Sequence, residues 1–126
     1  MIIDRCRDKQ ELYDLYIKYP MNDGIFDFEF ISNNPHLYCF YDEKKGFLRG
    51  YINIYRDEEK KLLLSGASIR KNMPENINAI IKVCEAYDEN MYADTDKKEA
   101  MICLLKAGFK KIKENLFVRY INGQRC

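Results

Sequence analysis

The sequence predicts one α/β domain of the α+β kind, with a mixed central sheet, an antiparallel meander, one parallel strand pair and helices on both faces. Its 126 residues are 47% hydrophobic and 33% charged, which is typical of a single compact domain with one core. The middle of the chain alternates short apolar runs with polar turns, as neighbouring antiparallel strands do. The second half alternates helical spacing with short apolar runs, which predicts a parallel pair. We therefore expect residues 1–126 to form one domain.

The amino-terminal third predicts a helix followed by an element of uncertain type. Residues 8–19 carry Leu12, Leu15, Tyr16 and Tyr19 at helical spacing, and Pro20 ends the pattern. Residues 25–31 then alternate apolar and acidic side chains between two turn-forming segments. This run is compatible with an edge strand or with a short helix.

Three strands are expected next. Residues 37–41 and 47–55 are rich in aromatic and β-branched side chains and flank a polar turn, which predicts a hairpin. A second charged turn leads into residues 62–69, a nearly continuous apolar run that belongs at the centre of the sheet. Together they form an antiparallel meander.

The remaining chain predicts a helix, a strand, a second helix and a final strand or two. Residues 73–89 have Pro74 in their first turn and an apolar stripe behind it, formed by Ile77, Ile80, Ile81, Cys84 and Tyr87. Residues 90–95 form a short strand parallel to the central one. Asp96 is expected to cap the next helix and Gly108 to end it, and residues 111–121 form one strand or two.

The charge balance and the cysteine content bear on whether the protein binds nucleic acid, a membrane or a metal. Lysine and arginine number 21 against 20 acidic residues, so no overall field favours nucleic acid or a membrane surface. The charged amino end and the lack of a run of ~20 apolar residues predict a soluble cytoplasmic protein. The five cysteines are odd in number and form no Cys-x-x-Cys pair, which indicates reduced thiols. With His36 as the only histidine, no metal site is expected.

This order of elements resembles the GNAT superfamily of acyl-CoA-dependent N-acyltransferases, from about residue 12 to residue 120. The best local match is Ala100 followed eight and nine positions later by Gly108 and Phe109, the spacing of that family's closing helix. Residues 47–52 look like its second hairpin strand, where a glycine follows a short turn. The resemblance implies the GNAT fold and, for an active enzyme, acetyl-CoA as the cofactor.

The resemblance also implies a pyrophosphate loop of pattern Arg/Gln-x-x-Gly-x-Gly/Ala at a helix amino terminus. Aligned on Arg70, the two small positions fall on Met73 and Glu75, while Pro74 removes an amide donor. Glu75 also places a negative charge near the expected phosphate, so this register favours no bound cofactor. A second register uses Asn76 and Asn78. If acyl-CoA binds, the candidate residues are Ser68, Ile69, Arg70, Lys71, Asn76, Ile77 and Asn78.

The proton-transfer residues of the family are not matched. The tyrosine that protonates the departing thiolate in many GNAT enzymes corresponds to Leu104, and leucine carries no transferable proton. Tyr92 or Tyr87 could substitute only if its hydroxyl reached the cleft. Glu29 or Asp27 could supply a base from the segment before the hairpin. Tyr92 and Glu29 are therefore the catalytic candidates.

Three functions follow from these features. The first is a GNAT-fold protein with a degenerate acyl-CoA site that acts through protein contacts, because its aromatic side chains exceed what a small sheet buries. It looks similar to small bacteriophage-encoded GNAT-like proteins, some associated with virion assembly, which would place it in the host cytoplasm or the virion. The alternative is an active N-acetyltransferase, and the second alternative is a nucleic-acid-binding module, which the acidic residues among its lysines disfavour. The first two functions differ in the gap that they predict between residues 62–69 and 90–95. A filled gap would exclude the pantetheine arm of acyl-CoA, whereas an open gap favours the active enzyme.

Overall fold

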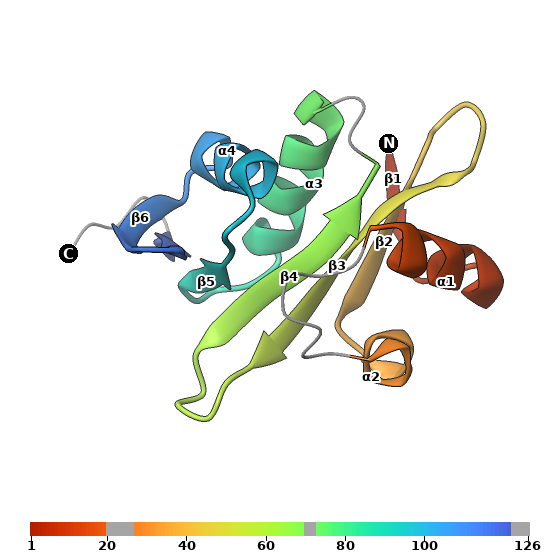
Figure 1. The fold of residues 1–126 in the computed structure, drawn as a ribbon. Helices are drawn as coiled ribbons and strands as arrows, with labels where there is room; N and C mark the ends of the chain where they lie inside the picture. Colours follow the sequence, from red (N-terminus) through yellow and green to blue (C-terminus); the bar gives the residue numbers. More distant parts are fainter. Residues whose placement is uncertain (20–26, 70–72, 122–126) are drawn as a thin grey trace.

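The computed structural model describes residues 1–19, 27–69 and 73–121. Within these ranges one seven-stranded sheet has the strand order β1-β2-β3-β4-β5-β7-β6 (Figure 1). Neighbouring strands are antiparallel except β4 and β5, which are parallel. The predicted mixed sheet with one parallel pair is confirmed. None of the described helices has the length and apolar character needed to span a membrane.

The amino-terminal part adds one strand that the sequence pattern did not predict. β1 (Ile2–Asp4) pairs with β2 at the edge of the sheet. α1 (Lys9–Lys18) begins after Asp8, whose carboxylate accepts hydrogen bonds from the backbone N–H groups of Gln10 and Glu11. α2 (Phe28–Asn33) begins after Asp27 in the same way, so the strand alternative for this segment is wrong over residues 28–31. Residues 20–26 lie outside the described ranges.

The meander and the elements that follow it lie close to their predicted positions. β2 (Leu37–Tyr41), β3 (Leu48–Arg56) and β4 (Leu62–Ser68) form the antiparallel meander. α3 (Met73–Glu85) precedes β5 (Met91–Asp94), and α4 (Lys98–Lys106) precedes β6 (Lys110–Lys113) and β7 (Leu116–Arg119). The chain thus ends in two strands.

Two predicted helix ends need correction. The helix predicted to reach residue 89 ends at Glu85, where the chain forms a turn. Asp96 does not cap α4, because the N-cap residue is Lys97, which makes no side-chain capping bond. Thr95 Oγ1 instead accepts a hydrogen bond from the Lys97 N–H at 3.1 Å. Gly108 ends α4 as predicted, with a φ of +98° that favours glycine.

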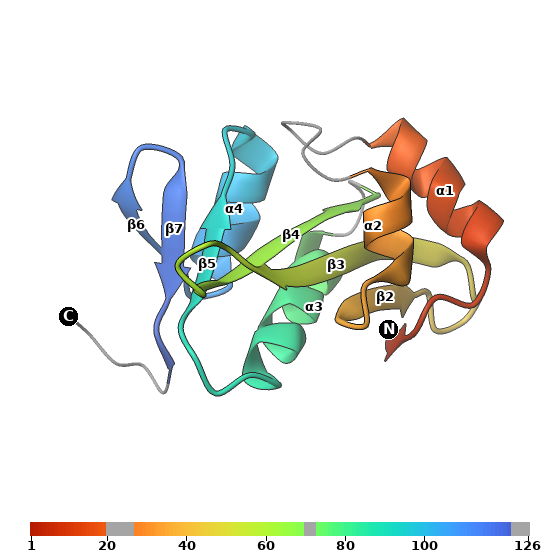
Figure 2. The same ribbon diagram turned by 90° about the horizontal axis from the view of Figure 1, so that it is seen from below.

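The sheet separates two apolar layers (Figures 1 and 2). α1 and α2 cover one face, and α3 and α4 cover the other. The layer under α1 and α2 is formed by Leu12, Leu15, Ile31, Leu37, Cys39, Tyr41, Leu48 and Tyr51. The layer under α3 and α4 includes Phe40, Ile52, Ile54, Leu64, Val83, Cys84, Met91 and Leu104. Because strand side chains alternate, neighbouring residues of β3 and β4 belong to different layers.

Candidate functional site

The parallel strands β4 and β5 pair over a short length and then diverge. The two strands pair only at Leu62–Met91 and Leu63–Tyr92, whereas β4 stays paired with β3 as far as Ser68. From Leu64 onward the edge of β4 that faces β5 has no strand partner in the described chain. Backbone N–H and C=O groups on such an edge can bond an extended ligand as they would bond another strand.

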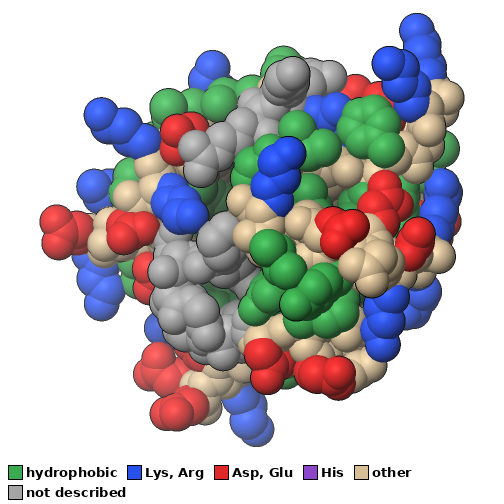
Figure 3. All heavy atoms as spheres, turned by 45° about the vertical axis from the view of Figure 1, so that its right-hand side comes forward, with side chains coloured by type: hydrophobic (Ala, Val, Ile, Leu, Met, Phe, Trp, Pro, Cys, Tyr) green, Lys and Arg blue, Asp and Glu red, His purple; other side chains and the backbone are tan. Residues whose placement is uncertain are grey.

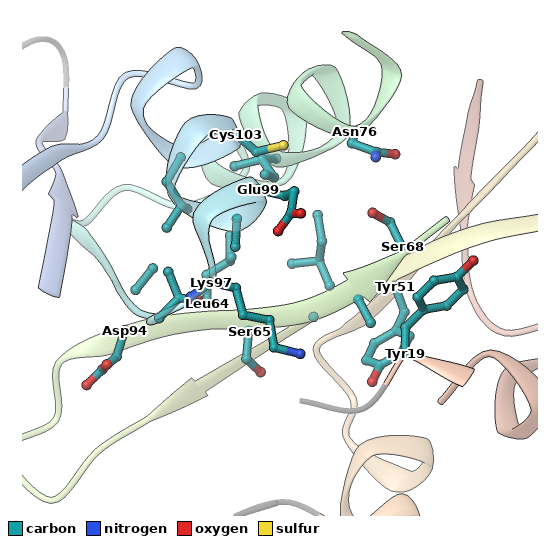
Figure 4. Close-up of a pocket in the computed structure, with 18 of the residues that line it drawn as sticks. Tyr19, Tyr51, Leu64, Ser65, Ser68, Asn76, Asp94, Lys97, Glu99 and Cys103 are labelled. Carbon is teal, nitrogen blue, oxygen red and sulfur yellow. Dashed lines mark hydrogen bonds between the residues drawn. The ribbon is translucent and has the colours of Figure 1, made fainter. Parts of the chain in front are cut away.

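A cavity of about 490 Å³ occupies this gap (Figure 4). It is lined from both faces of the sheet. The face under α3 and α4 contributes side chains that include Leu64, Ser68, Met73, Asn76, Glu99, Ala100, Cys103 and Leu104. The face under α1 and α2 contributes Tyr19, Tyr51, Tyr55, Asp57, Ser65 and Asp94. The gap is therefore open rather than filled by Met73 and nearby aromatic side chains.

Three buried polar atoms in the cavity wall have no hydrogen-bond partner among the described residues. Asn76 is 6% exposed, and its Nδ2 donates to the Ile69 carbonyl at 3.1 Å while its Oδ1 is unpartnered. The Ser65 Oγ and the Tyr51 hydroxyl are also unpartnered, and burial raises the pKa of Tyr51 far above its usual 10.0. Since unpaired buried polar groups cost free energy, this wall is suited to a ligand with hydrogen-bonding groups.

α4 places a carboxylate and a thiol in the cavity. Glu99 and Cys103 lie one turn apart, and both project from α4 into the space above β4 (Figure 4). Burial raises the pKa of the Cys103 thiol above 9.0, with the opposing effect of Lys106 smaller, so the thiol is protonated at neutral pH. The next residue, Leu104, also lines the cavity and is 4% exposed.

The acidic residue in the first turn of α3 is paired. Glu75 Oε2 lies 3.0 Å from Arg49 Nε, with the two side chains 29% and 7% exposed. The arginine therefore offsets the charge that we expected to repel a phosphate group at this helix end. Arg70 and Lys71, the other basic residues predicted for this site, lie outside the described ranges.

The structure brings some of the predicted cofactor residues to the cavity and places others elsewhere. Ser68 and Asn76 line it. Ile69 accepts the Asn76 hydrogen bond through its carbonyl, and its side chain lines a separate hollow beside α1. Ile77 packs in the layer under α3 and α4, and Asn78 is exposed.

The predicted catalytic residues lie outside the described wall of the cavity. Tyr92 lies on the opposite face of β5 from the cavity-lining Ala93, with Lys61 Nζ 5.2 Å from its ring centroid. Glu29 is exposed on α2 and accepts a hydrogen bond from Asn33 Nδ2 at 3.3 Å. The Tyr87 hydroxyl lies 2.7 Å from that of Tyr38.

The titratable groups on α4 were missed from sequence. Glu99 and Cys103 immediately precede Ala100 and Leu104, two residues that the resemblance singles out in this helix. Their four-residue spacing was the available signal. This spacing was not interpreted as a site, because in the family pattern only position 104 of this helix has a catalytic role.

Comparison with known proteins identifies the fold. No protein-family model and no curated protein matches the sequence. The fold is similar to that of several solved structures. An aminoglycoside 6′-N-acetyltransferase complexed with coenzyme A matches with a TM-score of 0.67 and 15% identity over 100% of both chains. A GNAT-family acetyltransferase from Listeria monocytogenes 4b F2365 matches with a TM-score of 0.61 and 14% identity over 93% of this chain and 91% of that one. The chain has the GNAT acetyltransferase fold.

Proposed function

We propose that the gap between β4 and β5 binds an acyl-coenzyme A and that the protein transfers the acyl group to an amine. The observation that carries this proposal is the separation of β4 from β5 after two residue pairs, with an open cavity beyond it. The pantetheine arm of coenzyme A is an extended chain with amide groups, which can pair with the unpartnered edge of β4. The coenzyme A complex of the aminoglycoside acetyltransferase supports the same ligand class here.

The phosphate end of the ligand would lie at the amino end of α3. A helix amino terminus attracts anions through its unpaired N–H groups and its dipole. The pairing of Glu75 with Arg49 lowers the repulsion that the sequence suggested for this position. Asn76, in the same turn, offers an unpartnered oxygen to an amide N–H of the ligand.

The amine would approach the thioester from the face under α1 and α2. Two unpartnered hydroxyls, those of Tyr51 and Ser65, line the cavity there. Asp57 and Asp94 line it as well, and carboxylates favour a protonated amine over an anion. This side of the cavity therefore suits an amine better than an acidic acceptor.

Filling the cleft tests the proposal. Ala100→Phe adds a ring to the α4 wall, whereas Ala86→Phe makes the same change at an exposed position after α3. We expect isothermal titration calorimetry to show coenzyme A and acetyl-CoA binding to the unchanged protein and to Ala86→Phe, and no binding to Ala100→Phe. Release of free thiol from acetyl-CoA with spermidine then measures transfer. An unchanged protein that binds neither ligand at millimolar concentration would exclude the proposal.

A second candidate function is a non-catalytic role through protein contacts. The observation in its favour is an apolar surface over α1 and α2, where Tyr13, Ile17 and Phe30 are 40%, 56% and 44% exposed (Figure 3). Exposed aromatic side chains of this kind anchor protein interfaces. Leu104 at the proton-donor position is compatible with this role. The same calorimetry distinguishes the two candidate functions, because a role through protein contacts needs no coenzyme A.

A further inference from the structure

We propose that Cys103 accepts the acyl group from the bound thioester, so that the protein works through a covalent acyl-cysteine. This inference rests on the proposed function, because it needs an acyl-coenzyme A in the cleft. It adds a reaction step and names the residue that performs it.

The position of the thiol is the first argument. Cys103 lies in the middle of α4, is partly exposed, and lines the cavity one helical turn from Glu99 (Figure 4). The described cysteines are free thiols, but Cys39 and Cys84 are buried in the two apolar layers and Cys6 lies near the amino end. None of those three lines the cavity. A thioester in the cleft would therefore meet Cys103 and no other described thiol.

The cavity wall itself supplies an independent sign of a ligand. Asn76 is buried to more than nine-tenths, and its Oδ1 has no partner among the described residues. An acceptor oxygen held in this way is satisfied by an N–H or O–H donor, and the pantetheine amides of coenzyme A carry N–H donors. Asn76 and Cys103 project from α3 and α4, the two helices that border the same side of the cavity (Figure 4).

The chemistry of the step suits a site without a tyrosine at position 104. The Cys103 sulfur attacks the thioester carbonyl, a new carbon–sulfur bond forms, and the bond to the coenzyme A sulfur breaks. The proton leaves Cys103 for the Glu99 carboxylate and ends on the coenzyme A sulfur, so atoms and charge balance without another reactant. Attacking and leaving sulfurs both belong to alkyl thiols, so the exchange needs no strong acid. The acyl group then passes to an amine, which regenerates the Cys103 thiol.

The test follows the acyl group directly. The full-length protein is incubated with acetyl-CoA without any amine, quenched in acid, and analysed by intact mass and peptide mapping. We expect the added mass of one acetyl group on Cys103, removable by neutral hydroxylamine as a thioester is. Cys103→Ala should abolish this label, whereas Cys6→Ala should retain it. Glu99→Gln should slow labelling on the order of a hundredfold.

Binding measured beside labelling separates this inference from the proposed function. Calorimetry with coenzyme A alone, which has no acyl group, reports occupancy of the cleft in each variant. Binding of coenzyme A to both proteins with the label lost only in Cys103→Ala supports the inference. Binding with no acetyl group on Cys103 overturns the inference and leaves the proposed function standing. A label spread over Cys6 and other thiols, unaffected by excess coenzyme A, also overturns it. Absence of both binding and label overturns the two together.

Discussion

The ion pair between Arg49 and Glu75 joins the centre of the sheet to the first turn of α3. Arg49 is 7% exposed in its side chain, so loss of its acidic partner leaves a buried cation less well compensated. We expect Glu75→Gln to lower the free energy of unfolding by about 2 kcal/mol, measured by urea denaturation. Glu114→Gln, at an exposed position before β7, is the matched control and should be neutral. Equal effects of the two changes would show that the pair contributes nothing.

The two acidic residues that precede helices α1 and α4 differ in what their carboxylates do. Asp8 accepts hydrogen bonds from the Gln10 and Glu11 N–H groups at 3.0 and 3.4 Å and so caps α1. Asp96 is exposed, and the N-cap position of α4 belongs to Lys97. We expect Asp8→Ala to cost about 1 kcal/mol in urea denaturation and Asp96→Ala to cost nothing measurable. A loss in Asp96→Ala as large as that in Asp8→Ala would contradict the assigned cap.

The element pattern was predictable where a segment has one strong periodicity. The β2–β3–β4 meander, both carboxy-terminal helices and the Gly108 stop follow from local spacing and turn chemistry. β1 was not predictable because its three residues are too few to show alternation. Residues 25–31 were ambiguous because so short a run fits both the alternation of a strand and the spacing of a short helix. The carboxylate of Asp27 accepts a hydrogen bond from the Phe30 N–H and so caps the helix that the structure contains.

The position of the cleft was predictable from the sequence, but the side chains that line it were not. The strand–helix–strand order predicts where β4 and β5 run in parallel, whereas their separation after Leu63 is visible only in three dimensions. Asn76 was named from the sequence on a phosphate-loop register. Its Nδ2 donates to the Ile69 carbonyl, and its Oδ1 has no partner among the described residues, which only the structure shows. Glu99 and Cys103 reach the cavity because α4 turns that face toward β4.

The stability of the whole molecule should depend on pH through two buried thiols, those of Cys39 and Cys84, one in each apolar layer. Burial raises the pKa of Cys39 and of Cys84 from 9.0 to about 12. The folded state therefore keeps both thiols neutral, whereas the unfolded chain loses these protons above about pH 9. By linkage, stability is fully present below that pH and falls as pH rises toward 12.

The loss should reach about 1.4 kcal/mol per thiol by about pH 10. Because both layers pack on one sheet, we expect a single cooperative transition whose midpoint falls with pH, followed by urea denaturation monitored through circular dichroism. The double variant Cys39→Ala/Cys84→Ala is less stable at neutral pH, since it removes buried sulfur, but its stability should decline less between about pH 8 and 10. An equal decline in the double variant would mean that these thiols do not govern alkaline unfolding, and two separate transitions would mean that the layers unfold independently.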